Sequence, residues 1–490
     1  MTGLRWRNLA ATISLCALAA CTVGPNYHRP SAPSSPAFKE AQGPVAAGWQ
    51  TGQPGDGIDK GAWWSMYHDA ELDWLETQVA TANQTVKEYE AAYREAHQVT
   101  AAARASFFPT VGVTADATRT HSANGVSTTT GTTTSSGDTT SSGGTRSSFT
   151  GALEASWVPD LWGKTRRTVE SDRDLAQASA ADLANARLAA QATLAQDYFE
   201  LRTLDEQATV YKSEIASFQQ FLDITKIQYQ QGTQAQSAVL TAQTQLLGAQ
   251  AAMQNLGVAR AAMEHAIAVL VGKAPSELSI PAAPTPKDVP EAPASLPSVL
   301  LQRRPDIAAA ERRMASENAL VGVATAAYFP TISLSGEYGT GASSLGNLFS
   351  AGTALWSLGG SLTETLLDFG ARHAQVQAAK AAYDQQVATY RQTVLTAFQG
   401  VEDELAALHV YAQEYDTLLK TEESAHQTVQ LDLAQYKAGT IDYTTVITAQ
   451  ATELSDRINR LTVLQERLQA SALLVEDLGG GWAATDLPKD

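Results

Sequence analysis

The sequence predicts a mainly α-helical fold with a smaller β part, most of it built twice. Two long segments indicate helices far longer than those of ordinary globular domains: 164–231 has neither glycine nor proline, and 371–438 has a single glycine, Gly400. Four shorter segments alternate apolar and polar residues with the period of a β-strand. Several short motifs recur in the second half of the chain, which predicts a tandem duplication.

The first 20 residues have the layout of a signal peptide. Arg5 and Arg7 form a basic start, and a short apolar stretch and small residues lead to Cys21. This order resembles the lipobox of bacterial lipoproteins, in which Cys21 would carry diacylglycerol and an N-acyl chain. The alternative is an ordinary secretory signal that contains a cysteine. Thr22 follows where an aspartate would indicate inner-membrane retention, so the resemblance favours the outer membrane.

Composition excludes several classes of function. The 490 residues carry a formal net charge of −17, whereas a nucleic-acid binder needs a surplus of Lys and Arg on one face. The only cysteines are Cys16, which leaves with the signal, and Cys21. A lipidated mature chain therefore has no thiol for a disulfide, a metal cluster or a nucleophile. No later stretch has 18 consecutive apolar residues, so we predict no transmembrane helix.

Proline-rich stretches divide the chain. After the signal (1–20), residues 21–60 predict an extended, lipid-anchored linker, because prolines recur throughout them. A first structural repeat covers 61–274. A proline-rich connector follows at 275–297, then a second repeat at 298–478 and a C-terminal tail at 479–490.

Each repeat contains one very long helix and one shorter helix. About 68 residues at 1.5 Å each give a helix of roughly 100 Å. The shorter helices are expected at 233–271 and 440–478, after turns that contain Gly232 and Gly439. Helices of this length need support from neighbouring helices, so we expect coiled packing.

The duplication rests on motifs that share residue types and order. Those of the first half are Phe107-Phe108-Pro109-Thr110-Val111, Trp162-Gly163, Tyr229-Gln230-Gln231-Gly232-Thr233 and Ala242-Gln243. Those of the second half are Tyr328-Phe329-Pro330-Thr331-Ile332, Phe369-Gly370, Tyr436-Lys437-Ala438-Gly439-Thr440 and Ala449-Gln450.

The period-two segments predict one β-hairpin per repeat, at about 109–158 and 330–367. The strands are expected at Thr110–Thr118, Ser148–Trp157, Thr331–Tyr338 and Ala354–Thr363. The Ser/Thr/Gly tract from Ser122 to Ser148 should form a loop, because it has few apolar residues.

Two features favour a membrane sheet over the alternative of a half-buried soluble sheet. Aromatic residues lie at strand ends, as in the girdles of outer-membrane barrels, and Asp116, Glu154 and Glu337 all fall on the polar face. Four strands cannot close a barrel, and an open edge in lipid leaves backbone groups unpaired. The residues therefore predict an oligomer, without fixing the number of copies.

The chain resembles a known family, the outer membrane factors. These are the TolC-like ducts of tripartite pumps, here most similar to the NodT-type lipoprotein branch that serves resistance-nodulation-division transporters. The resemblance covers nearly the whole mature chain. It rests on Trp63-Trp64 with Tyr67, Asp69 and Leu72, on Leu300-Leu301-Gln302-Arg303-Arg304-Pro305-Asp306-Ile307 with Glu311, on Tyr328-Phe329-Pro330, and on the two Tyr-x-x-Gly-Thr turns.

The resemblance implies a homotrimer with a β-barrel in the outer membrane and an α-barrel in the periplasm. It implies a passive export duct, fed by an inner-membrane transporter through a periplasmic adaptor, with outer-membrane lipid as a further partner. From the residues themselves we expect no catalysis, no metal and no cofactor beyond the lipid on Cys21. Two alternatives stay open: the duct of a type I protein secretion system, and a structural periplasmic lipoprotein.

The resemblance also assigns candidate working residues. The turns at Gly232, Thr233, Gly439 and Thr440 are expected to contact the adaptor; alternatively, the glycines only close the turns.

The periplasmic gate of the family lies just past the second turn, often with rings of aspartate. Here that stretch offers Asp442, Tyr443, Thr444 and Thr448 as gate candidates. Only one of them is acidic, which puts an acidic-ring gate in doubt.

Sequence motifs of enzymes are not found. The eight histidines are scattered, without an HExxH pattern, and the chain has neither a Walker loop nor a GxSxG elbow. The sequence also contains no element that would identify the exported compound.

Overall fold

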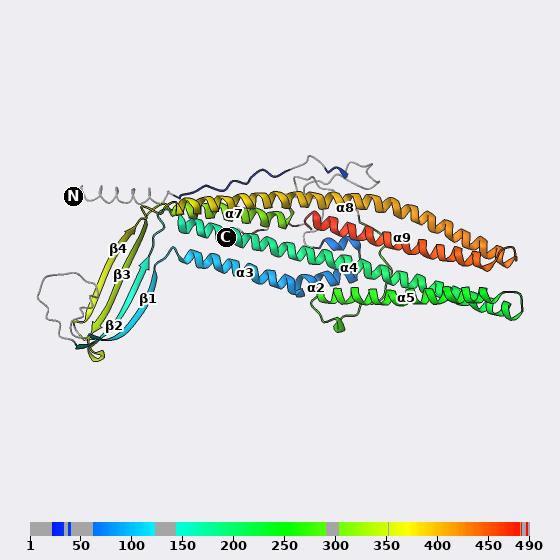
Figure 1. Cartoon of the computed structure of the whole chain (residues 1–490), viewed down its shortest axis with the longest axis horizontal. Helices are drawn as coiled ribbons and strands as arrows, with labels where there is room; N and C mark the ends of the chain where they lie inside the picture. The colour runs from blue at the N-terminus through cyan, green and yellow to red at the C-terminus, as the bar shows by residue number, and fades with distance from the viewer. Residues whose placement is uncertain are drawn as a thin grey trace. The chain divides into compact units, whose positions relative to one another are not determined.

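The computed structural model describes residues 22–33, 38–40, 62–122, 144–290, 303–350, 352–480, 482 and 487–488. Figure 1 shows their long helices and single sheet. The first repeat contains η2 (Trp63–Tyr67), α2 (Ala70–Ala82), α3 (Gln84–Ala105), β1 (Thr110–Ser122), β2 (Gly144–Trp157), α4 (Lys164–Gln230) and α5 (Gln236–Leu270). The connector contains η3 (Pro275–Glu277). The second repeat contains α7 (Pro305–Ala326), β3 (Thr331–Ala342), η4 (Leu345–Asn347), β4 (Ala354–Thr363), α8 (Ala371–Lys437) and α9 (Tyr443–Asp477).

The predicted duplication is confirmed by the lengths of the helices. Helices α4 and α8 have 67 residues each, and α5 and α9 have 35 each. Both long helices follow a glycine of positive φ, Gly163 (83°) and Gly370 (93°). None of the helices described here has a stretch long and apolar enough to cross a bilayer.

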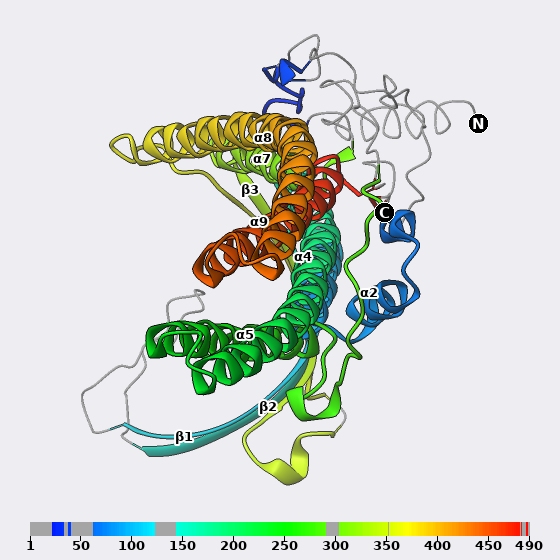
Figure 2. The ribbon, with the colours of Figure 1, turned by 90° about the vertical axis from the view of Figure 1, so that its right-hand side faces the viewer.

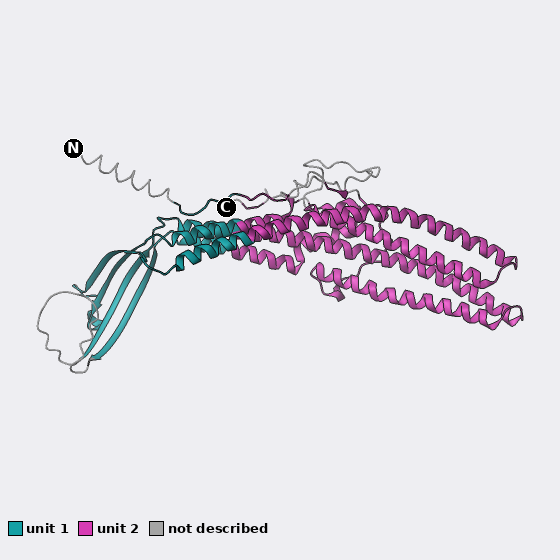
Figure 3. Cartoon of the chain, turned by 45° about the horizontal axis from the view of Figure 1, so that its top comes forward, with its two compact units in different colours: residues 1–28, 97–174, 315–385 teal, residues 29–96, 175–314, 386–490 magenta. Residues whose placement is uncertain are grey.

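Contacts divide the chain into two compact units, coloured separately in Figure 3. Unit 1 comprises residues 1–28, 97–174 and 315–385 and contains the sheet. Unit 2 comprises residues 29–96, 175–314 and 386–490.

The four strands of unit 1 form one antiparallel sheet in the order β1-β2-β3-β4, which is curved in Figure 2. Thr110 pairs with Ser156 in the first hairpin, and the corresponding Thr331 pairs with Thr363 in the second. The two hairpins therefore share one register. Strand β1 ends four residues later than predicted, at Ser122, and β2 begins four residues earlier, at Gly144. The loop prediction is therefore wrong for 144–148, which belong to β2, and 123–143 lie outside the described residues.

Residues 22–33 of the predicted N-terminal linker contain no helix or strand, and they and residues 38–40 are held by specific contacts. In unit 1, the Val23 amide donates to Trp162 O at 3.1 Å. The Arg167 side chain donates to Gly24 O at 3.4 Å and to Asn26 Oδ1 at 2.9 Å. In unit 2, Phe38 is buried against Phe398. Cys21 lies outside the described residues, so its lipidation stays a prediction.

The core of unit 2 contains the Trp63-Trp64 motif. Trp63, Tyr67 and Leu72 are buried together with Tyr198 and Phe199 of α4. Asp69 caps α2, because its side chain accepts from the amides of Glu71 and Leu72. This part of the family motif therefore builds a helix start and a core.

Candidate functional site

The apolar face of the sheet is exposed to solvent in the single chain. Side chains that a soluble protein would bury are 60–80% exposed on it: Val111 68%, Val113 79%, Tyr338 63%, Trp356 72% and Leu362 64%. An exposed apolar surface of this size marks a contact with lipid or protein.

The opposite face of the sheet is polar. Glu154 and Glu337 are directly paired across β2 and β3, and Thr114 Oγ1 donates to Glu154 Oε1 at 2.9 Å. Ser333 and Ser361 share a hydrogen bond of 2.7 Å. Two facing carboxylates repel each other unless water solvates them, so this face requires an aqueous environment.

The sheet has two edges, β1 and β4, that no other described strand covers. Each edge presents a row of backbone groups without partners in a neighbouring strand. An apolar outer face, a wet inner face and two open edges together fit a segment of a transmembrane barrel.

The two helix–helix turns of unit 2 have the same geometry. Gly232 and Gly439 have φ of 74° and 73°. Thr233 N donates to Gln228 O at 2.9 Å, and Thr440 N donates to Gln435 O at 3.0 Å. Both turns are glycine-closed helix ends in which the last carbonyls accept from the residues after the helix. A Cβ added at either glycine would meet no atom within 4 Å, so both turns offer open surface.

The gate candidates on and before α9 divide between two environments. Tyr443 is buried, with its ring 5.1 Å from that of Phe221 and 5.5 Å from that of Tyr436. Asp442, Thr444 and Thr448 are exposed, and Thr448 Oγ1 donates to Thr444 O at 2.9 Å. The aromatic gate candidate is therefore buried, whereas the three polar candidates are exposed to solvent.

Tyr443 belongs to an apolar cluster that joins the two helical hairpins. The cluster combines residues of α4, α5 and α9: Phe218, Leu222, Ala242, Leu246, Ala249, Tyr443, Val446 and Ile447. Tyr436 adds a hydrogen bond of 2.9 Å to Gln228 Oε1 on α4. The α8–α9 hairpin is therefore attached to the α4–α5 hairpin near the tips.

Ion pairs farther from the tips were missed by the sequence reasoning. Glu422 of α8 accepts from both Arg457 (3.0 Å) and Arg460 of α9. Burial alone would raise the pKa of Glu422, but the hydrogen bonds from the two arginines outweigh it and lower the pKa. Asp205 of α4 similarly accepts from Arg260 of α5 at 2.6 Å.

A signal for these pairs is present in the sequence. Glu422 and Arg457 lie at nearly equal distances from Gly439, as Asp205 and Arg260 do from Gly232. Two antiparallel helices bring residues at equal distances from their turn side by side, so opposite charges at such positions predict an ion pair.

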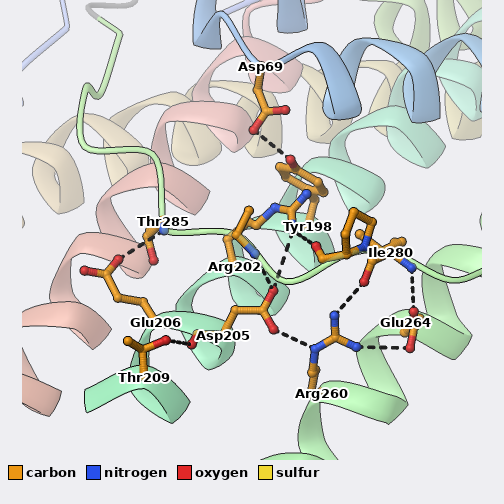
Figure 4. A network of polar contacts seen from close by, with 12 residues as sticks. Asp69, Tyr198, Arg202, Asp205, Glu206, Thr209, Arg260, Glu264, Ile280 and Thr285 are labelled. Carbon is orange, nitrogen blue, oxygen red and sulfur yellow. Dashed lines mark hydrogen bonds and ion pairs between the residues drawn. The ribbon is translucent and has the colours of Figure 1, made fainter. Parts of the chain in front are cut away.

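A polar network holds the connector after α5, and Figure 4 shows it. Arg202 donates to Pro281 O at 2.6 Å, Arg260 donates to Ile280 O at 2.7 Å, and the Ile280 amide donates to Glu264 at 2.6 Å. The backbone of the connector is therefore hydrogen-bonded to charged side chains of α4 and α5. Its remainder, from residue 291, lies outside the described residues.

Among the described residues, no group of three or more His, Cys, Asp or Glu side chains could hold a metal ion. The candidate functional surfaces are therefore the exposed apolar face of the sheet and the open turns at Gly232 and Gly439.

Comparison with known proteins agrees with this geometry. The family model for outer membrane efflux proteins matches residues 75–273 and 296–480. The chain is 28% identical over 491 residues to outer membrane protein OprJ of Pseudomonas aeruginosa, with 97% of this chain and 96% of OprJ covered. It is also 28% identical to the toluene efflux pump outer membrane protein TtgF of Pseudomonas putida, with 95% of each chain covered.

Solved structures show the same fold. The outer-membrane channel OprN superposes with a TM-score of 0.84 at 27% identity, covering 94% of this chain and 100% of OprN. The open state of the MtrE outer membrane channel of Neisseria gonorrhoeae gives 0.80 at 26% identity, with 94% and 98% covered. The chain belongs to the outer membrane efflux protein family, whose members are channels of the outer membrane.

Proposed function

We propose that this chain is the outer-membrane duct of a tripartite efflux pump, working as a homotrimer. Its sheet would supply four strands of a barrel with about twelve, and its helices would supply one third of a periplasmic tube. The observation that carries the proposal is the sheet itself, which has an exposed apolar face, a wet face and two uncovered edges.

The partners follow from this arrangement. A periplasmic adaptor would dock on the open turns at Gly232 and Gly439, and an inner-membrane transporter of the resistance-nodulation-division class would deliver the substrate. Several relatives carry names of antibiotic or toluene efflux pumps, which supports export of small molecules over protein secretion. Acylation of Cys21 would add a lipid anchor on the periplasmic side of the outer membrane.

The barrel is tested by placing a charge on either face of one strand. Leu358 and Ser357 are adjacent in β4, on the apolar and the polar face, respectively. Leu358→Arg should greatly reduce the amount of protein in the outer membrane, because arginine facing lipid costs about 2–4 kcal/mol. Ser357→Arg should be tolerated there and should change single-channel conductance in planar bilayers. Equal tolerance of both variants, in a protein that forms no pores, would exclude a duct.

The proposed lipid on Cys21 is tested separately, by mass spectrometry. The N-terminal peptide of the mature protein should carry the mass of three acyl chains, and Cys21→Ser should abolish it. An unmodified Cys21 in protein purified from membranes would remove the lipid anchor but leave the duct intact.

A further inference from the structure

Two aromatic residues connect the two hairpins of the sheet inside the chain. The rings of Trp162, just after β2, and Phe329, just before β3, stack with centroids 5.0 Å apart and an interplanar angle of 24°. Trp162 Nε1 also donates to Pro330 O at 2.7 Å. The corner that leaves β2 is thereby fastened to the start of β3, the strand with which β2 pairs.

Because the chain is duplicated, Trp162 and Phe329 each have an equivalent residue in the other repeat. Phe369 stands in front of Gly370 and α8, as Trp162 stands in front of Gly163 and α4. Phe108 precedes Pro109 and β1, as Phe329 precedes Pro330 and β3.

This second pair is not joined within one chain. Phe369 is 93% exposed and Phe108 is 70% exposed. They follow β4 and precede β1, which are the opposite edges of the four-stranded sheet, three strand spacings or roughly 14 Å apart.

The backbone of Phe369 is also unusual. Its φ is 51°, in the left-handed region, where a residue with a bulky side chain costs about 1 kcal/mol or more. This exposed ring, held at such a cost, has no stacking partner among the described residues of its own chain, which points to a partner in a second copy.

We propose that Phe369 of one chain stacks on Phe108 of a neighbouring copy, as Trp162 stacks on Phe329, and thereby fastens β4 to β1 of the neighbour. This inference rests on the proposed homo-oligomeric barrel and specifies how its chains join. The junction between chains then repeats the junction that each chain already contains between its own hairpins.

The duplication also specifies the strand register of this junction. Thr110 corresponds to Thr331 and Ser156 to Thr363, because these positions pair identically in the two hairpins. Within the chain, β2 pairs with β3 through Trp157 and Leu334.

The equivalents of Trp157 and Leu334 are Glu364 and Val113, so these two should pair between copies. In the antiparallel sheet, Ser361 then lies opposite Asp116 of the neighbour, and Leu362 lies opposite Ala115. Within the strands this register places apolar Leu362 beside apolar Ala115 and polar Ser361 beside polar Asp116, and Glu364 lies just past the end of β4.

Cysteine cross-linking in outer membranes tests the register. Asp116→Cys with Ser361→Cys should give disulfide-linked oligomers up to the trimer on non-reducing gels, because directly opposite residues have Cβ atoms about 5 Å apart. The matched pair Asp116→Cys with Gly359→Cys lies on the same face, two residues out of register, and should cross-link at least tenfold less. Each single-cysteine variant controls for the Cys21 thiol. Stronger cross-linking of the shifted pair would overturn the proposed register.

The stacking is tested by a double-mutant cycle on the full-length protein. Phe369→Ala and Phe108→Ala should each lower the temperature at which the oligomer dissociates in detergent, and the double variant should be no worse than the poorer single variant. Leu366→Ala, at a residue of the same corner that is 91% exposed, should leave this temperature unchanged.

The possible results separate this inference from the proposed function. Conducting trimers in which the two phenylalanine effects simply add would refute the stacking while leaving the duct in place. A monomeric protein without channel activity, in wild type and variants alike, would refute both.

Discussion

The guanidinium of Arg304 donates a hydrogen bond of 2.6 Å to Asp477 Oδ1, joining the residue before α7 to the last residue of α9. Arg304 also donates to Asp477 O at 2.8 Å and to Asp306 Oδ2 at 2.8 Å. Helix α8 passes close to this ion pair, because a Cβ added at Gly400 would lie 2.6 Å from Asp477 Oδ2. The one glycine inside the long helix α8 thus makes room for the carboxylate that Arg304 binds.

Gly400→Ala should therefore destabilise the protein, although alanine favours helices. The added methyl group would displace the Asp477 carboxylate from Arg304, and overpacking of a filled site, here a half-buried one, costs about 1–3 kcal/mol. Gly257→Ala in α5 is the matched control: a Cβ there meets no atom within 4 Å, so the substitution should stabilise by about 0.5–1 kcal/mol. Thermal unfolding followed by circular dichroism checks both, and a higher midpoint for Gly400→Ala would contradict the argument.

The carboxylates around this ion pair predict a pH dependence. Burial, followed by repulsion from Asp477, Asp403 and Glu476, raises the pKa of Glu404 to about 7. The folded protein then holds this proton more tightly than the unfolded chain. Stability contributed by the protonated carboxyl is fully present below about pH 4.5 and is lost as pH rises towards 7. Glu404→Gln should accordingly be more stable than wild type at pH 8 and nearly equal to it at pH 4.5.

Unfolding midpoints measured at intervals between pH 4.5 and 8 test this expectation. Glu423→Gln on the same helix is a control, because Glu423 is exposed. If both substitutions change the pH profile equally, the effect comes from net charge and not from burial of Glu404.

The long helices and the hairpins could be predicted because their signals are local. A segment without glycine or proline predicted α4, and alternation predicted β4 as Ala354–Thr363, the bounds that the structure has. The outer ends of β1 and β2 were missed because they carry no apolar alternation. They are ordered by pairing with each other, as in the hydrogen bond of 3.0 Å between His121 and Thr145.

Features that depend on how helices face one another could not be predicted in this way. The sequence placed Tyr443 beside Thr444 in one candidate gate, but only the packing of α9 shows that Tyr443 lies buried against Phe221. Composition likewise identified the connector as proline-rich, but it did not indicate which side chains are hydrogen-bonded to the connector. One of those side chains, Glu264, lies on the preceding helix α5, and another, Arg202, comes from α4, much farther away in sequence.

Gly439→Trp tests adaptor docking at the second turn. The open space around Gly439 should let folded trimers reach the outer membrane, although the positive φ makes a side chain cost about 1–2 kcal/mol. The bulk of the indole should block the adaptor and abolish drug resistance. Gly439→Ala carries the same backbone cost without the bulk and should retain resistance. Full resistance of the tryptophan variant would exclude this turn as a docking point.

Tyr443→Ala tests whether the cluster between the hairpins keeps the periplasmic end closed. Loss of a buried aromatic side chain should cost about 3 kcal/mol and should release α9 from α4 and α5. Single-channel conductance in planar bilayers should then increase. Thr444→Ala, at the exposed neighbouring residue, should change conductance less. If neither variant differs from a substitution at a distant exposed residue, the gate lies elsewhere.

Gly322→Val tests how the N-terminal segment is held on unit 1. Gly24 and Gly322 touch through their backbones, since a Cβ added at Gly24 would lie 2.4 Å from Gly322 Cα. A Cβ at Gly322 would lie 2.9 Å from Cγ of Arg167, whose side chain bonds residues 24 and 26. The valine should therefore displace the segment and break the bond from the Val23 amide to Trp162 O. Hydrogen exchange of that amide should accelerate at least tenfold, whereas Gly346→Val, in open space, should leave it unchanged. Unchanged exchange in Gly322→Val would show that the segment does not depend on this contact between glycines.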